Sequence, residues 1–206
     1  PIIRKCLRSF FSARRQSRQN EIFQIVTEWH IKRSRVSAAL QFALSSHSST
    51  LITEVIEYYG PHTITIKSGA TALKQCLENI TNNEINKSLR LSLARAVVLI
   101  KDGHFLMAKK KLQQIESKLD WDQVFNDDRE GSVQADYIAS KYLLALYKNE
   151  NFNTAFLDKC EVETHRYSAS DGLIGFIHAL KSLLYQRNST FSRAQMEAKR
   201  SLYYYK

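Results

Sequence analysis

One short pattern recurs three times and restricts the fold more than any other feature of the sequence. It is a phenylalanine followed three residues later by an alanine, placed directly after a polar break, at residues 105–108, 152–155 and 191–194. A small alanine lets two helix backbones approach closely, and an aromatic ring beside a turn covers the end of the preceding helix. The pattern therefore predicts helical hairpins whose alanines (Ala108, Ala155 and Ala194) are buried where helices touch.

Segments with a single apolar face precede each break, at residues 89–100, 135–146 and 173–184. Their apolar spacing is close to 3.6 residues, which predicts helices. The alanines lie 47 and then 39 residues apart, more than the roughly 34 of a regular tetratricopeptide repeat. We therefore expect an all-α fold, a right-handed superhelix of about three antiparallel helical hairpins, irregular and similar to a tetratricopeptide-repeat (TPR) solenoid.

Further helices are predicted upstream, at residues 22–29, 36–44, 51–59 and 70–80. The chain has only 6 Gly and 2 Pro, so it lacks the turns that many short strands would need. Residues 63–66 alternate as a strand would, but so short a strand has nothing to pair with, and we interpret them as the start of a helix. Whether residues 51–80 pack as a regular hairpin or as an irregular bridge stays open.

Charge is concentrated near the N-terminus. The net charge is +10, and the first twenty residues hold no acid and six basic side chains: Arg4, Lys5, Arg8, Arg14, Arg15 and Arg18. A cluster confined to one end, without a groove-reading motif, favours contact with a neighbouring module or solvent over direct binding of nucleic acid. We interpret residues 109–111, three consecutive lysines, as the solvent face of a helix.

Residues that could carry chemistry are scattered. The histidines show no metal-ligand spacing, Cys160 and His165 are five apart and do not share a helix face, and the acidic segment 120–131 lacks a calcium-loop order. We expect neither a metal nor a catalytic site, and the protein is predicted not to be an enzyme. Three widely spaced cysteines favour a reducing, cytoplasmic location, and no apolar run approaches the roughly 20 residues that cross a bilayer.

Both ends suggest a larger protein. The sequence begins with Pro1 and not Met, and it ends with three tyrosines, at 203–205, inside a helical pattern without a capping signal. We expect the chain to continue beyond both ends, and self-association through the tyrosines stays open.

Three segments occur in an order that resembles a known family. Pro1-Ile-Ile-Arg-Lys-Cys-Leu7, Trp29-His30 and Val36-Ser-Ala-Ala-Leu-Gln-Phe-Ala-Leu44 resemble the region after the nucleotide-binding module of MalT-like, LuxR-family ATP-dependent transcriptional regulators. Residues 89–96 and 101–108 look like that family's first sensor hairpin. The sequence departs from the pattern at two turns, where Arg33-Ser34 replaces the usual Gly and residues 45–47 replace the usual Asp.

The resemblance implies three parts: the end of a winged-helix element with a basic lead-in (1–18), a helical arm (19–85) and truncated TPR-like sensor repeats (86–206). It implies a non-catalytic regulatory fragment that binds an inducer or a regulatory protein. ATP would bind only in a missing upstream module, because residues 67–71 have the wrong order for a phosphate loop. DNA would bind only through a missing helix-turn-helix domain. The fragment itself would hold no cofactor.

In stacked hairpins the first helix of each pair lines the inner, ligand-binding surface. By that geometry we predict partner contacts at Arg90, Lys101, Tyr137, Lys148 and Arg187. Two other interpretations stay open: a self-contained TPR-like scaffold that docks a peptide of a protein partner, and a basic helical protein that binds nucleic acid.

Overall fold

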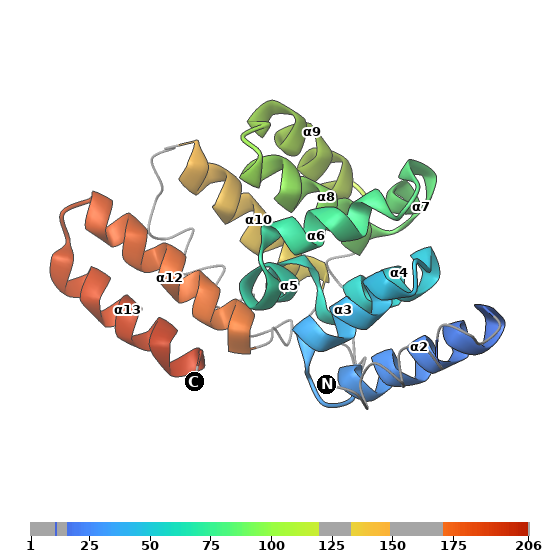
Figure 1. Cartoon of the computed structure of the whole chain (residues 1–206). Helices are drawn as coiled ribbons and strands as arrows, with labels where there is room; N and C mark the ends of the chain where they lie inside the picture. Colours follow the sequence, from blue (N-terminus) through green and yellow to red (C-terminus); the bar gives the residue numbers. More distant parts are fainter. Residues whose placement is uncertain (1–10, 12–15, 120–132, 149–170, 206) are drawn as a thin grey trace.

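The computed structural model describes residues 11, 16–119, 133–148 and 171–205 (Figure 1). Every regular element in these ranges is a helix, so the all-α prediction is confirmed for them. The helices are α2 (Gln16–Ile31), α3 (Val36–Ser45), α4 (Ser49–Tyr59), α5 (Pro61–Ser68), α6 (Ala70–Glu78), α7 (Asn82–Lys87), α8 (Leu89–Lys101), α9 (Phe105–Glu116), α10 (Val133–Tyr147), α12 (Asp171–Arg187) and α13 (Phe191–Tyr204). No helix among these is long and apolar enough to cross a bilayer.

Local signals fix where several helices begin. Residues 63–66, which alternate like a strand, lie inside α5, whose first residue is Pro61; proline suits that position because its missing N–H would have no helical partner there. Thr81 and Glu84 form a reciprocal capping box at the start of α7. Ser88 Oγ accepts the Leu91 N–H at 3.0 Å and so caps α8.

Several turns use the left-handed backbone region without glycine. Ser34 has φ 51°, His47 has φ 53° and Ser189 has φ 55°. The first two lie in the turns where the sequence departs from the MalT-like pattern, Ser34 in the Arg33-Ser34 pair that replaces the glycine of that pattern. The turns form nonetheless, at the conformational cost that a Cβ atom adds in this region.

Helices adjacent in sequence pack most extensively in pairs: α2 with α3, α8 with α9, and α12 with α13 (Figure 1). In the last pair Ser201 Oγ donates to the Gly175 carbonyl at 2.8 Å and Ser182 Oγ donates to the Ala194 carbonyl at 2.8 Å. The partners run in opposite order along the two helices, so α12 and α13 are antiparallel.

The phenylalanine–alanine pattern is confirmed in part. Ala108 is fully buried and Ala194 is 8% exposed, as close helix contact requires. Phe105 is half-buried against the core, but Phe191 is 65% exposed, so the prediction that it covers a helix end is wrong. A ring at the start of a helix is covered only where a third element lies over it, and among the described helices α13 has its main contacts with α12. The pair at residues 152–155 lies outside the described residues.

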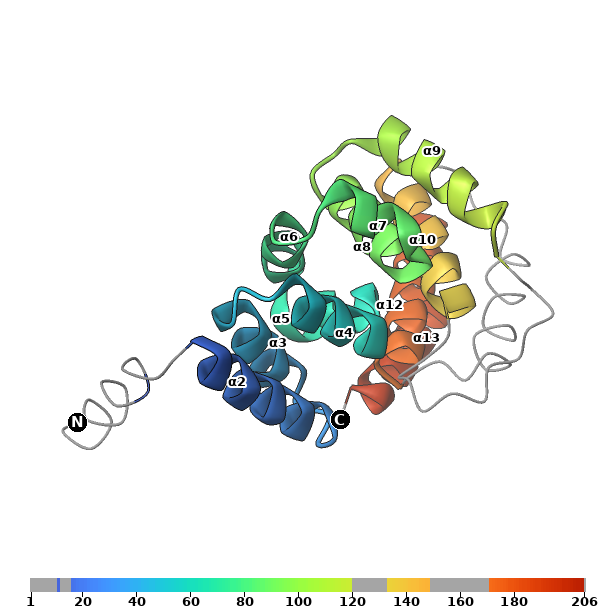
Figure 2. The ribbon, with the colours of Figure 1, turned by 90° about the vertical axis from the view of Figure 1, so that its right-hand side faces the viewer.

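Helix α8 is the centre of the described structure. It packs against α4, α5, α6 and α7, which precede it in the chain, and against α9 and α10, which follow it (Figure 1, Figure 2). Nine of its residues are buried, which explains why its sequence is nearly all apolar or small. The predicted arm and the predicted repeats therefore share one hydrophobic core.

A buried ion pair crosses this core. Arg90 on α8 lies with its Nε 3.3 Å from Oδ2 of Asp136 on α10, and both side chains are almost fully buried. Arg90 also donates to the backbone carbonyl of Glu57 near the end of α4. Burial raises the pKa of Asp136 to about 6 against the attraction of Arg90. The pair joins three helices that lie far apart in the sequence.

Asp136 also forms a hydrogen bond with the first turn of α5. Its carboxylate accepts the backbone N–H of His62, one of the donors that the first turn of a helix leaves without an internal partner. Gly60, which precedes α5, lies so close that a Cβ atom there would overlap the Asp136 carboxylate. A buried acid on α10 thus caps a helix of the predicted arm.

The His62 side chain extends the same network. Ser140 Oγ donates to the Asp136 carbonyl at 2.8 Å, so it accepts the hydrogen bond from His62 Nε2, 2.9 Å away. The imidazole lies 5.3 Å from the Phe176 ring of α12. Burial lowers the pKa of His62 to about 3, which keeps the ring neutral at physiological pH.

We predict that Gly60→Ala destabilises the protein more than Gly69→Ala. Both glycines have the same extended backbone with positive φ (φ 75° and 87°, ψ 159°), so alanine costs each about 1–3 kcal/mol. Only at Gly60 does the added methyl meet a neighbour, the Asp136 carboxylate, which adds about 1–3 kcal/mol. Urea unfolding followed by circular dichroism measures both losses; equal losses would contradict the close packing of α5 on α10.

We predict that His62 makes the fold sensitive to acid. The pKa of His62 in the folded protein lies below its usual value of 6.5, so the unfolded chain gains a proton below pH 6.5 that the folded chain takes up only near pH 3. The contribution of His62 to stability is therefore full above pH 6.5 and is lost as the pH falls toward 3, by about 1.4 kcal/mol per pH unit. Between pH 7 and 5 the wild type should lose about 2 kcal/mol more than His62→Gln. His104→Gln, at an exposed position, is the control, and parallel pH profiles for wild type and His62→Gln would sink the prediction.

Candidate functional site

Groups that could carry catalysis are buried or isolated in the described part of the chain. No cluster of three or more His, Cys, Asp or Glu side chains suited to a metal occurs there. His178 and Glu197 lie 2.6 Å apart, but both are buried between α12 and α13. Burial raises the pKa of the Cys76 thiol to about 12, so it is protonated at neutral pH. Cys6, Cys160, His165 and the acidic segment 120–131 lie outside the described residues.

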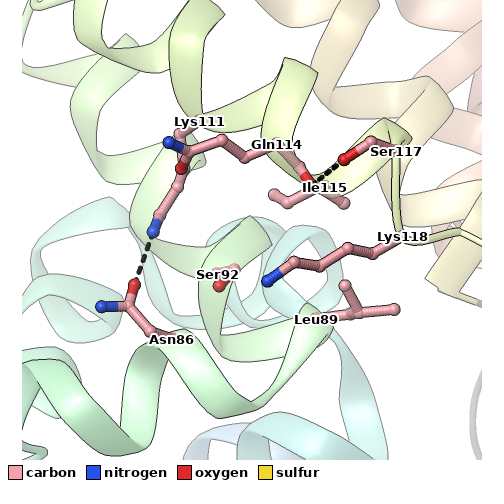
Figure 3. Close-up of a pocket in the computed structure, with 8 residues that line it drawn as sticks. All are labelled: Asn86, Leu89, Ser92, Lys111, Gln114, Ile115, Ser117 and Lys118. Atoms are coloured by element: carbon pink, nitrogen blue, oxygen red, sulfur yellow. Dashed lines mark hydrogen bonds between the residues drawn. The ribbon is translucent and has the colours of Figure 1, made fainter.

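A solvent-open pocket lies between α9 and the helices α7 and α8 (Figure 3). Its volume is about 370 Å³, within the range of small-molecule sites. Its lining combines two lysines, two side-chain amides, two hydroxyls and two aliphatic residues: Asn86, Leu89, Ser92, Lys111, Gln114, Ile115, Ser117 and Lys118. None of these side chains is acidic.

Two ammonium groups enter the pocket from the α9 side. Lys111 Nζ donates to Asn86 Oδ1 at 2.7 Å, which ties α9 to α7. Lys118 extends across the pocket toward Ser92 (Figure 3). The Ser92 hydroxyl is held in place by a hydrogen bond that it donates to the Ile85 carbonyl of α7 at 2.9 Å.

The local fold explains why both lysines face the same space. Helix α9 ends at Glu116, and the N–H of Lys118 donates to the Ile115 carbonyl at 2.9 Å, a turn that brings residue 118 back beside the helix. Consecutive helical residues are separated by about 100°. Three consecutive lysines therefore cannot share one face, and Lys111 turns toward the pocket while Lys109 and Lys110 stay exposed.

Like charges surround Lys111. Its pKa is lowered first by burial, then by the positive charges of Lys118 and Arg95. Burial disfavours the charged ammonium and nearby cations repel it. The positive charge of Lys111 is therefore less stable in the pocket than in water.

The structure separates the five predicted contact residues into two groups. It corrects the prediction for Arg90 and Tyr137, which are 1% and 2% exposed and belong to the core. On an ideal solenoid their positions would face the inner surface, but here α8 and α10 are covered by helices on several sides. Lys101, Lys148 and Arg187 are exposed, and partner contact at these three residues stays a prediction.

Two of the exposed residues flank a second hollow, near the end of α10. Lys101 Nζ lies 2.9 Å from the Tyr147 hydroxyl, and Arg187 donates to the Leu146 carbonyl at 3.2 Å. This open groove of about 520 Å³ is lined by Leu146, Tyr147, Leu183, Gln186 and Arg187. It is mainly apolar, and its two cations are already engaged with the protein.

Of the basic lead-in, only Arg18 is described. It is exposed and pairs with Glu21 at 2.6 Å on the same helix, an arrangement typical of a solvated helix surface. Arg4, Lys5, Arg8, Arg14 and Arg15 lie outside the described residues.

Sequence reasoning did not find the pocket. Its polar residues come from three helices and one turn, and no spacing rule links them. The one available signal was the lysine run at 109–111, because a helix must direct one member of such a run away from the others.

Comparison with known proteins adds no relative. No family model, curated protein or solved structure matches the chain.

We predict that Lys118→Gln raises the pKa of Lys111, because it removes one of the two cations that lower it. Side-chain NMR of the lysine ammonium groups as a function of pH measures the change. Lys110→Gln removes the same charge from an exposed position on α9 that does not line the pocket and is the control. If both variants shift the Lys111 titration equally, the pair does not share the pocket as described.

Proposed function

We propose that the chain is a non-catalytic helical-repeat module that binds a small ligand in the pocket between α7, α8 and α9. The observation that carries the proposal is the pocket itself, in which side chains from separate helices converge on a space open to solvent. Lysine, amide and hydroxyl groups can hold a ligand by hydrogen bonds, and Leu89 and Ile115 offer it apolar contact.

The proposal includes a TPR-like arrangement of the helices. The pairs α8–α9 and α12–α13, with α10 packed on both members of the first pair, support repeated hairpins. Proteins built from such repeats bind partners on the extended concave surface that stacking creates.

A role as the sensor part of a MalT-like regulator is compatible with this proposal and rests on the sequence resemblance alone. Ligand binding would then bias the arrangement of modules on either side of the chain. This assignment requires that the parent gene encode a phosphate loop upstream and a helix-turn-helix domain downstream.

We predict that Gln114→Trp blocks the pocket. Gln114 is exposed and lines it, so a tryptophan there fills the opening without disturbing the core. In a fragment screen followed by ¹H–¹⁵N NMR, ligands of the wild type should shift the amide signals of Leu89, Ser92 and Ile115. These shifts should vanish in the variant.

Gln113→Trp is the matched control. It places the same side chain one residue earlier on α9, at an exposed position outside the pocket lining, and should leave fragment binding intact. A screen in which neutral, anionic and cationic fragments all fail to shift the pocket signals would overturn the proposed function.

A further inference from the structure

The two charged side chains that line the pocket, Lys111 and Lys118, are hydrogen-bond donors only. The carbonyl oxygen of Asn86 accepts from Lys111, and its amide nitrogen is a further donor. Lys111 has donor protons beyond that bond, and Lys118 presents an ammonium with three. The hydroxyl protons of Ser92 and Ser117 are used on the backbone carbonyls of Ile85 and Gln114.

Among the described residues, the charges around Lys111 are positive. Its pKa is lowered by the cations Lys118 and Arg95, and none of the described residues that line the pocket is acidic. Glu116, the acidic residue of α9, pairs with Lys141 on α10 at 3.3 Å. An anion between the two lysines would relieve their repulsion and satisfy their donors at once.

From these observations we infer that the pocket binds a small phosphate monoester, with the phosphate between Lys111 and Lys118. The inference rests on the proposed function and names the chemical class of its ligand. A dianionic group with three acceptor oxygens matches two ammonium groups and a side-chain amide.

The size of the pocket indicates more than free phosphate. A phosphate group occupies a few times the roughly 30 Å³ of a water molecule, a fraction of the 370 Å³ present. The remaining space borders Leu89 and Ile115, with the Gln114 amide beside them. A small organic group of mixed polarity fits there.

A cation or a neutral sugar fits less well. A cation would add to the repulsion that already lowers the pKa of Lys111. A neutral polyol leaves the repulsion between the pocket's ammonium groups uncompensated. The charge of the pocket thus selects for an anion.

Isothermal titration calorimetry with phenyl phosphate tests the inference on the full chain at pH 7.5, where the ligand carries nearly two negative charges. Wild type should bind it more tightly than inorganic phosphate, and phenol should not bind measurably. Lys118→Gln should weaken binding about tenfold and the double variant Lys111→Gln/Lys118→Gln about a hundredfold, since each removes a charge-assisted hydrogen bond. Bound phenyl phosphate should also raise the pKa of Lys111.

The matched control is Lys109→Gln/Lys110→Gln, which removes two charges from the same helix outside the pocket and should change binding less than twofold. If this variant weakens binding as much as the pocket variant, the ligand follows surface charge and the inference fails. Binding of inorganic phosphate as tight as that of phenyl phosphate assigns the site to the free ion and overturns the organic ligand. If phenol shifts the pocket NMR signals and phenyl phosphate does not, the anion inference fails while the proposed function stands. If no probe shifts them, both fail.

Discussion

The packing of the other helices depends on the ion pair between Arg90 on α8 and Asp136 on α10. Both charges are removed from water, and such a pair survives only when further hydrogen bonds satisfy each partner. Arg90 therefore reaches the Glu57 carbonyl, and Asp136 accepts the N–H of His62. Removing one partner from a buried pair costs about 3–5 kcal/mol. The cost makes α4, α5, α8 and α10 one cooperative unit.

Local physics made the helices predictable. The 3.6-residue apolar spacing located α8, α10 and α12 to within a few residues, and the alanines at 108 and 194 were correctly placed at helix contacts. Phe191 was not, because the exposure of a ring at a helix start depends on whether another element covers it. Arg90 was predicted on the inner surface from solenoid geometry, which does not foresee that partners 46 and 33 positions away, Asp136 and the Glu57 carbonyl, hold it in the core.

The candidate site was beyond sequence reasoning in a different way. Lys111 and Lys118 are two of 30 basic residues, and their chemistry differs from that of the others only because α7, α8 and a helix-terminal turn bring them to one space. An apolar residue can be assigned to a core from its spacing, because burial follows from periodicity. A binding residue is defined by what lies opposite to it, and that depends on tertiary contacts between elements that sequence spacing does not relate.

The buried pair and the pocket are linked through α8. Arg90 and Ser92 are two residues apart on this helix; the first is fixed by Asp136 and the second forms the inner wall of the pocket. The core therefore holds the inner wall in place before a ligand arrives, so binding costs little conformational entropy there. The ammonium groups of Lys111 and Lys118, by contrast, lie at the ends of long, flexible side chains from α9 and the turn after it. The rigid α8 wall suits the organic part of a ligand, which it can orient. The flexible Lys111 and Lys118 side chains suit its anionic group, which they can follow and bind.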